Sequence, residues 1–148
     1  MILLRKKKFF NTKQERQLIE AIKEAELNTS GEIRVHVENH SKGDVYGRAL
    51  QVFNELEMHK TALRNGILFY LATKDHEFAV IGDEGIHRVV GDDFWENIKN
   101  EIEIKFRVKK FVDGLVQGIL KAGEQLKIHF PYQTDDRNEL SNEISQGD

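Results

Sequence analysis

The order of hydrophobic and polar residues along the chain predicts alternating helices and strands. Residues 12–28 carry apolar side chains at helical spacing, which predicts an amphipathic helix. Residues 32–38 then alternate strictly, with Ile33, Val35 and Val37 on one face and polar or charged side chains on the other. This alternation is typical of a strand that is buried on one face only.

The middle of the chain predicts a second helix followed by a β-hairpin. Asp44 can cap a helix that continues to Leu56 on an apolar inner face. Residues 67–72 form an unbroken apolar run, which indicates a strand covered on both faces. A second apolar run, residues 78–81, begins only a few residues later, so the two runs are expected to pair as a hairpin.

Two further helices are predicted in the last third of the chain. The first is expected to begin at Asp92 and the second to cover residues 111–128. Residues 82–93 lie between the hairpin and these helices, and their glycines and acidic side chains predict a bent loop with one short helical turn. We expect residues 1–130 to be a single domain, followed by a polar tail, residues 131–148, without stable structure.

The fold class that this order indicates is α/β, with helices flanking a small mixed central sheet. The first two strands are expected to be parallel because a helix connects them, and the hairpin adds an antiparallel strand. Residues 2–4 are apolar and are expected to supply a fourth strand at an edge of the sheet.

Composition and charge narrow the kind of protein. The chain of 148 residues contains no cysteine, which excludes disulfides and thiolate metal sites. Its net charge of −3 argues against a general nucleic-acid-binding protein. Its start is unlike an export signal and its apolar runs are shorter than the ~20 residues that span a bilayer, so we expect a cytoplasmic protein without a membrane span.

Acidic residues near glycines are the candidate binding site. Four carboxylates follow the hairpin within residues 82–93, and one more precedes the second helix; they are Asp83, Glu84, Asp92, Asp93 and Asp44. If the loops that hold them converge, their mutual repulsion is best relieved by a divalent cation. Carboxylate oxygens are hard ligands, so the sequence predicts Ca²⁺ or Mg²⁺ as the ion.

The chain resembles the TPM domain family between about Thr12 and Leu126. The resemblance is carried by five motifs in order: Thr29-Ser30-Gly31-Glu32, Asp44 with Ala49 and Phe53, Asn65-Gly66-Ile67-Leu68, Gly82-Asp83-x-Gly85-Ile86, and Phe111-x-x-Gly114-Leu115-x-x-Gly118-Ile119. The family implies an αβα sandwich, divalent ions bound in loops at one end of the sheet, and an acid phosphatase activity in some members. His87 stands where the family has a glutamate, a departure that weakens the case for phosphatase chemistry.

Three hypotheses about function follow. The first is a metal-binding domain, for Ca²⁺ in particular, with a regulatory or partner-binding role. The second is a weak metal-dependent acid phosphatase, in which Asp44 or His87 transfers protons. The third is a protein interaction module that uses no metal.

Overall fold

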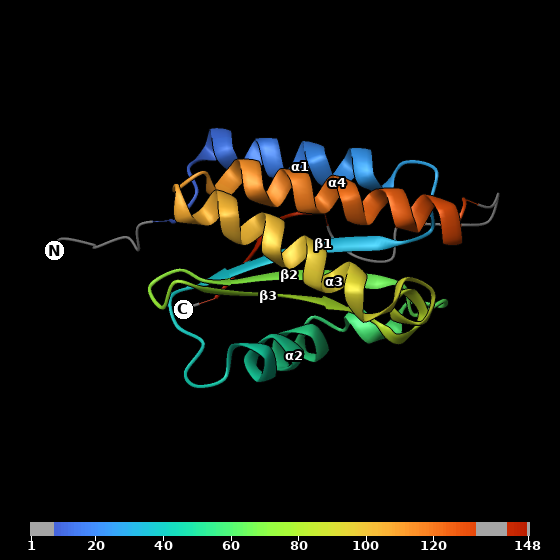
Figure 1. The fold of residues 1–148 in the computed structure, drawn as a ribbon, viewed down its shortest axis with the longest axis horizontal. Coiled ribbons are helices and arrows are strands. Elements are labelled where there is room, and N and C mark those ends of the chain that lie inside the picture. The colour runs from blue at the N-terminus through green and yellow to red at the C-terminus, as the bar shows by residue number, and fades with distance from the viewer. Residues whose placement is uncertain (1–7, 133–141, 148) are drawn as a thin grey trace, which may run out of the picture.

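The computed structural model describes residues 8–132 and 142–147 and shows an α/β fold (Figure 1). These residues contain four α-helices and four strands, and their order includes the predicted hairpin and the predicted pair of helices after it. The elements in order are α1 (Thr12–Glu26), β1 (Glu32–Glu38), α2 (Val45–Glu55), the short 3-10 helix η1 (Met58–Lys60), β2 (Gly66–Ala72), β3 (Glu77–Gly82), α3 (Glu84–Arg107), α4 (Phe111–His129) and β4 (Ser145–Gln146).

The sheet is mixed, with the strand order β3-β2-β1-β4. Strands β1 and β2 are parallel, and Glu32 lies opposite Gly66 at their start. Strands β2 and β3 are antiparallel and form the predicted hairpin, so that Gly82 lies opposite Ile67. Strand β4 runs parallel to β1 and pairs with its second half. The prediction of a small mixed sheet is therefore confirmed.

Helices cover both faces of the sheet but in unequal number. Figure 1 shows α1, α3 and α4 on one face and α2 on the other. Strand β2 is buried along its whole length, as its apolar run predicts. Phe69 packs among the residues of the three-helix side, whereas Leu68 and Tyr70 pack with α2. The period of two along a strand divides its side chains between these two cores.

The acidic segment after the hairpin is helical, which corrects the predicted loop. Helix α3 begins at Glu84, eight residues before the predicted start, and Asp83 caps it by accepting a hydrogen bond from the Glu84 amide at 2.8 Å. Gly91 has φ 76° and ψ 174° and kinks the helix. This conformation is open almost only to glycine, so Gly91 bends a helix where the sequence analysis predicted an open loop.

Part of the C-terminal tail belongs to the sheet, which corrects the expectation that residues 131–148 have no stable structure. Ser145 and Gln146 pair with His36 and Val37 of β1, and the Gly147 amide donates to the Val37 carbonyl at 2.7 Å. The free edge of β1 presents backbone groups that need partners, and β4 supplies them. Residues 2–4, predicted as the fourth strand, lie outside the described residues.

Candidate functional site

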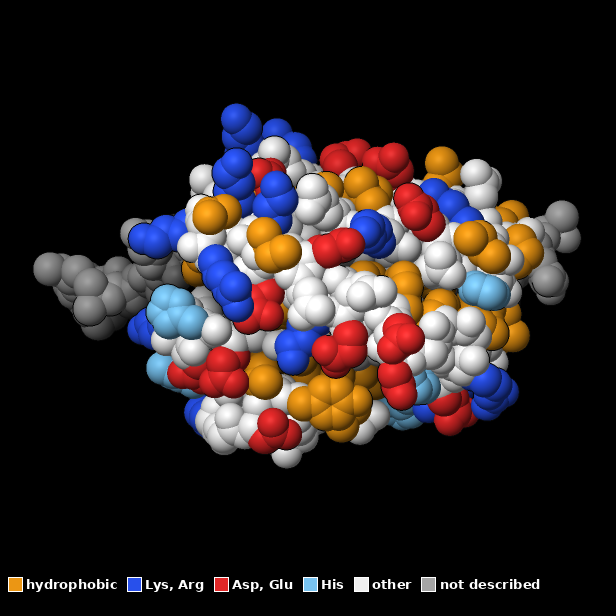
Figure 2. Space-filling view, viewed as in Figure 1, with side chains coloured by type: hydrophobic (Ala, Val, Ile, Leu, Met, Phe, Trp, Pro, Cys, Tyr) orange, Lys and Arg blue, Asp and Glu red, His pale blue; other side chains and the backbone are white. Residues whose placement is uncertain are grey.

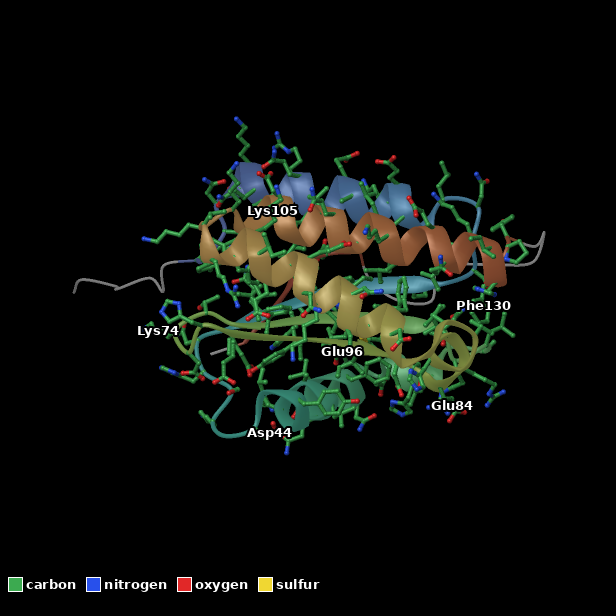
Figure 3. All side chains as sticks on the ribbon, in the orientation of Figure 1. Asp44, Lys74, Glu84, Glu96, Lys105 and Phe130 are labelled. Atoms are coloured by element: carbon green, nitrogen blue, oxygen red, sulfur yellow. The ribbon has the colours of Figure 1, made fainter. Side chains whose placement is uncertain are left out.

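The two acidic loops of the sequence prediction lie at opposite ends of the sheet. Because β1 and β2 are parallel, the loop that holds Asp44 follows the carboxyl end of β1, beside the turn after Ala72. Strand β3 returns in the opposite direction, so Gly82 and Asp83 lie beside the start of β1 and β2. Figure 3 shows Asp44 and Glu84 toward these different ends. The expected convergence of all five carboxylates therefore does not occur.

Asp83 and Glu84 are engaged by an arginine that the sequence analysis did not consider. The Asp83 side chain is 6% exposed and accepts hydrogen bonds from Arg64 Nε at 2.7 Å and Arg64 Nη2 at 2.8 Å. Arg64 Nη1 lies 3.3 Å from Glu84 Oε1. A bidentate arginine supplies the charge that a cation would otherwise provide. Arg64 precedes β2 by two residues, and only the pairing of β2 with β3 brings it to Asp83.

Asp92 and Asp93 lie on α3 just after its kink, and both are exposed. Asp92 Oδ1 is 3.4 Å from His87 Nε2, and Trp95 Nε1 donates to His87 Nδ1 at 3.0 Å. His87 therefore bridges the two halves of the kinked helix. Within residues 8–132 and 142–147, no three His, Asp or Glu side chains form a group that could hold a metal ion.

The opposite end of the sheet contains a loop that Asp75 holds in place. The Asp75 carboxylate accepts hydrogen bonds from the Ser41 amide at 2.8 Å and the Ser41 hydroxyl at 3.3 Å, and it lies 2.7 Å from His40 Nδ1. The Ser41 hydroxyl is also 3.3 Å from the Gly43 carbonyl oxygen. The hydrogen bond with His40 lowers the pKa of Asp75. Asp44 ends the loop and caps α2 by accepting from the Gly47 amide at 2.9 Å.

A buried polar network lies beneath this loop, on the α2 face of the sheet. The Glu38 side chain is 3% exposed and accepts from Arg48 Nε at 2.8 Å, from Arg48 Nη2 at 3.0 Å and from the Tyr70 hydroxyl. His36 Nε2 lies 3.1 Å from Glu38, and His36 Nδ1 lies 3.0 Å from the Ser145 hydroxyl. Burial alone would raise the pKa of Glu38, but these hydrogen bonds outweigh it and lower the pKa to about 2.

The strict alternation predicted a strand with one solvent-exposed face, and the network corrects this prediction because the polar face of β1 is covered. Arg48 of α2 and the β4 segment cover it, and six of the seven residues of β1 are buried. Sequence periodicity indicates which side chains share a face of a strand. It does not indicate whether a polar face contacts water or polar side chains from another element.

A hollow of about 960 Å³ adjoins the network at the carboxyl ends of β1 and β2. In open α/β sheets, ligands bind at this edge of the parallel strands. The lining combines basic, polar and apolar residues, namely Lys8, Phe9, Val37, Glu38, Asn39, Thr73, Lys74, Gln146 and Gly147. The candidate functional site is therefore this end of the sheet, whereas the acidic start of α3 lies at the other end.

Residues 4–125 match the TPM domain family, which is most of the chain. The chain belongs to the TPM domain family. The five motifs noted in the sequence indicate the same family, and the α/β fold agrees with it. No curated protein matches the chain.

Three solved structures of other proteins are similar to the chain. The BA42 protein from the psychrophilic bacterium Bizionia argentinensis is 47% identical, with a TM-score of 0.88 over 97% of this chain and 99% of that one. The N-terminal domain of a P. gingivalis protein is 18% identical, with a TM-score of 0.65 over 84% and 82%. The N-terminal domain of cg2496 from Corynebacterium glutamicum is 12% identical, with a TM-score of 0.64 over 80% and 74%. The last two share the fold alone.

The described part of this TPM domain contains no candidate for a membrane span. Each helix within residues 8–132 is too short or too polar to cross a bilayer.

Proposed function

We propose that this TPM domain binds a divalent cation, Ca²⁺ or Mg²⁺, in the loop between β1 and α2. The observation that carries the proposal is that the Ser41 hydroxyl lies close to a carboxylate oxygen and to a backbone carbonyl oxygen. This hydroxyl lies 3.3 Å from both the Asp75 carboxylate and the Gly43 carbonyl. Carboxylate, hydroxyl and carbonyl oxygens are the ligands that Ca²⁺ accepts.

The backbone of the loop supports this assignment. Lys42 and Gly43 have φ angles of 56° and 127°, which turn the chain back toward Asp75. Asp44 follows directly and is exposed, so its second carboxylate oxygen can join the set. Two carboxylates are few for a Ca²⁺ site, so backbone and water oxygens would complete the coordination.

The other four acidic residues of the sequence prediction are weaker candidates. Arg64 already forms ion pairs with Asp83 and Glu84. Asp83 and Glu84 also lie at the start of α3, where the helix dipole is positive and opposes a cation. Asp92 and Asp93 remain exposed and serve as a matched comparison in the test.

The role that we propose for the ion is regulatory. An ion shared by Ser41, Gly43 and Asp75 would stiffen the loop and the β2–β3 turn together, and these segments form the rim of the hollow at this end of the sheet. A protein partner that recognises the ordered rim would then bind in a metal-dependent way.

Thermal unfolding with and without metal tests the proposal. We expect the melting temperature in 1 mM Ca²⁺ to be higher than in EDTA. When the Ca²⁺ concentration is one hundred times the dissociation constant, the unfolding free energy should increase by ~2.7 kcal/mol. Asp44→Asn and Asp75→Asn should each lose most of this gain. The matched double variant Asp92→Asn/Asp93→Asn, at the other end of the sheet, should keep it.

Two outcomes would contradict the proposal. Equal melting temperatures in Ca²⁺, Mg²⁺ and EDTA would mean that no divalent ion binds the folded state preferentially. If only the Asp92→Asn/Asp93→Asn variant loses the gain, the ion binds at α3 and not in the loop. Comparing each variant with itself, with and without metal, removes any effect of the substitution on the fold.

The alternative function, a weak metal-dependent acid phosphatase, would use the same edge of the sheet, where Lys8 and Lys74 line the hollow. Turnover of p-nitrophenyl phosphate that requires metal and is lost in Asp44→Asn would favour it. We expect only slow turnover, because efficient phosphoryl transfer needs several positioned groups that stabilise charge in the transition state.

A further inference from the structure

A pocket lined by aromatic rings lies between the β2–β3 turn and the turn that joins α3 to α4. Its volume is about 390 Å³, within the range of small-molecule sites. Four phenylalanines line it, namely Phe9, Phe78, Phe106 and Phe111. Their rings meet edge to face, with centroids 5.0 Å apart for Phe78 and Phe106 and 5.3 Å apart for both Phe106 and Phe111 and Phe9 and Phe111.

The aromatic rings are only partly covered, although they form a cluster. Phe9 is 42% exposed, and the other three are of intermediate burial. These rings pack against each other and still leave a hollow between the two turns. The hollow is an apolar site that can hold the apolar part of a small molecule.

Basic side chains surround this aromatic pocket. Arg107 and Lys109 line it directly, and the hollow that contains Lys8 and Lys74 adjoins it, since both include Phe9 and Thr73. Figure 2 shows Lys and Arg side chains gathered at this end of the molecule. Lys74, labelled in Figure 3, lies at the tip of the β2–β3 turn.

The acidic residues of the rim do not cancel this charge. Glu103 pairs with Arg107 at 3.1 Å, and Glu77 is the other carboxylate that lines the aromatic pocket. Within the described residues, no carboxylate lies at ion-pairing distance from Lys74 or Lys109, so both ammonium groups are available to a ligand.

We propose that the aromatic pocket binds a small organic anion, whose aromatic or short acyl body contacts the phenylalanines and whose carboxylate, sulfonate or phosphate meets Lys74 and Lys109. The apolar body accounts for the uncovered rings and the anionic group accounts for the lysines. This site shares the β2–β3 turn with the proposed cation loop, but none of its proposed contacts requires a metal ion.

The test uses two fluorescent probes that differ in charge, with the full chain in EDTA. The anionic probe is 8-anilinonaphthalene-1-sulfonate, and its neutral counterpart is N-phenyl-1-naphthylamine. We expect saturable one-to-one binding of the anionic probe, with amide shifts confined to residues 73–78 and 106–111. Each substitution, Lys74→Gln or Lys109→Gln, should weaken it about twofold to fivefold, which is the upper part of the range for loss of one exposed ion pair.

Matched lysines elsewhere provide the control. Lys60→Gln and Lys121→Gln remove exposed charges that pair with Glu57 and Glu101 and should leave the anionic probe unaffected. Equal binding of the neutral and anionic probes, unchanged by Lys74→Gln and Lys109→Gln, would overturn the role of the lysines. Absence of saturable binding, or amide shifts at other residues, would overturn the site. Because EDTA is present, the result is independent of whether the loop binds a cation.

Discussion

Glu38, which is buried, and Glu26, which is partly buried, differ in how many hydrogen-bond donors reach their carboxylates. Glu38 is ionised because Arg48, Tyr70 and His36 all reach it. Glu26, the last residue of α1, has far fewer donors: its Oε2 accepts from the Ile33 amide at 2.8 Å. Burial raises the pKa of Glu26 to about 7, although the hydrogen bonds from Ile33 and Glu32 oppose the shift.

The raised pKa of Glu26 makes stability fall as pH rises. The folded state holds the proton up to about pH 7, whereas the unfolded chain releases it near the ordinary glutamate pKa of 4.5. The contribution of Glu26 is therefore fully present below pH 4.5 and is lost as pH rises through 7, by at most about 3 kcal/mol. We expect Glu26→Gln, which cannot ionise, to flatten the dependence of unfolding free energy on pH over this window.

Urea unfolding at several pH values between 4.5 and 8 measures this effect. Glu24→Gln is the matched control, because Glu24 lies on the same helix and is exposed. If the wild-type and Glu26→Gln curves remain parallel across this range, the proton on Glu26 does not affect folding.

Among the elements, α3 departs most from the sequence expectation, and Gly91 is the reason. The sequence pattern predicts a loop around this glycine, but its backbone joins two helical segments at a kink. A Cβ added at Gly91 would meet no atom within 4 Å, so the backbone conformation alone requires glycine there.

Replacing Gly91 should therefore destabilise the fold without a steric clash. We expect Gly91→Ala to lower the unfolding free energy by roughly 1–3 kcal/mol, the cost of such a backbone conformation for a residue with a side chain. The single tryptophan, Trp95, follows the kink by four residues and reports the transition by fluorescence. Asp93→Ala, an exposed change on the same helix, should alter stability by about 0.5 kcal/mol or less; similar losses for both variants would contradict this account.

The same elements show how far sequence patterns reach. The apolar run of β2 and the spacing of α4 depend on local periodicity, and both were predicted within a few residues of their observed bounds. The start of α3 was not, because Asp83 and Gly91 are equally suited to a loop and to a helix cap or kink. Asp83 also pairs with Arg64, which lies 19 residues earlier in the chain, and no local pattern indicates this contact.

For the whole molecule, the two layers that cover the sheet are unequal. Among residues 8–132 and 142–147, eighteen buried residues form the core beneath α1, α3 and α4, whereas nine form the core beneath α2. We expect the α2 layer to open before the rest of the domain, because less apolar surface holds it. Hydrogen exchange in low urea should show amides of α2 exchanging through partial opening, while those of β2 exchange only through global unfolding. Identical exchange free energies in α2 and β2 would show instead that the domain opens as one unit.

The sequence by itself determined the class of the fold, the positions of most helices and strands and the family, because these depend on periodicity and short motifs that lie close together in the chain. Only the tertiary structure decided which ends of the sheet the acidic residues occupy, since that depends on the antiparallel return of β3. It also decided that Arg64 meets Asp83, that Asp75 meets Ser41, and that β4 closes the edge of β1 over His36. Each of these contacts joins residues that are distant in sequence, and no local pattern encodes such a contact.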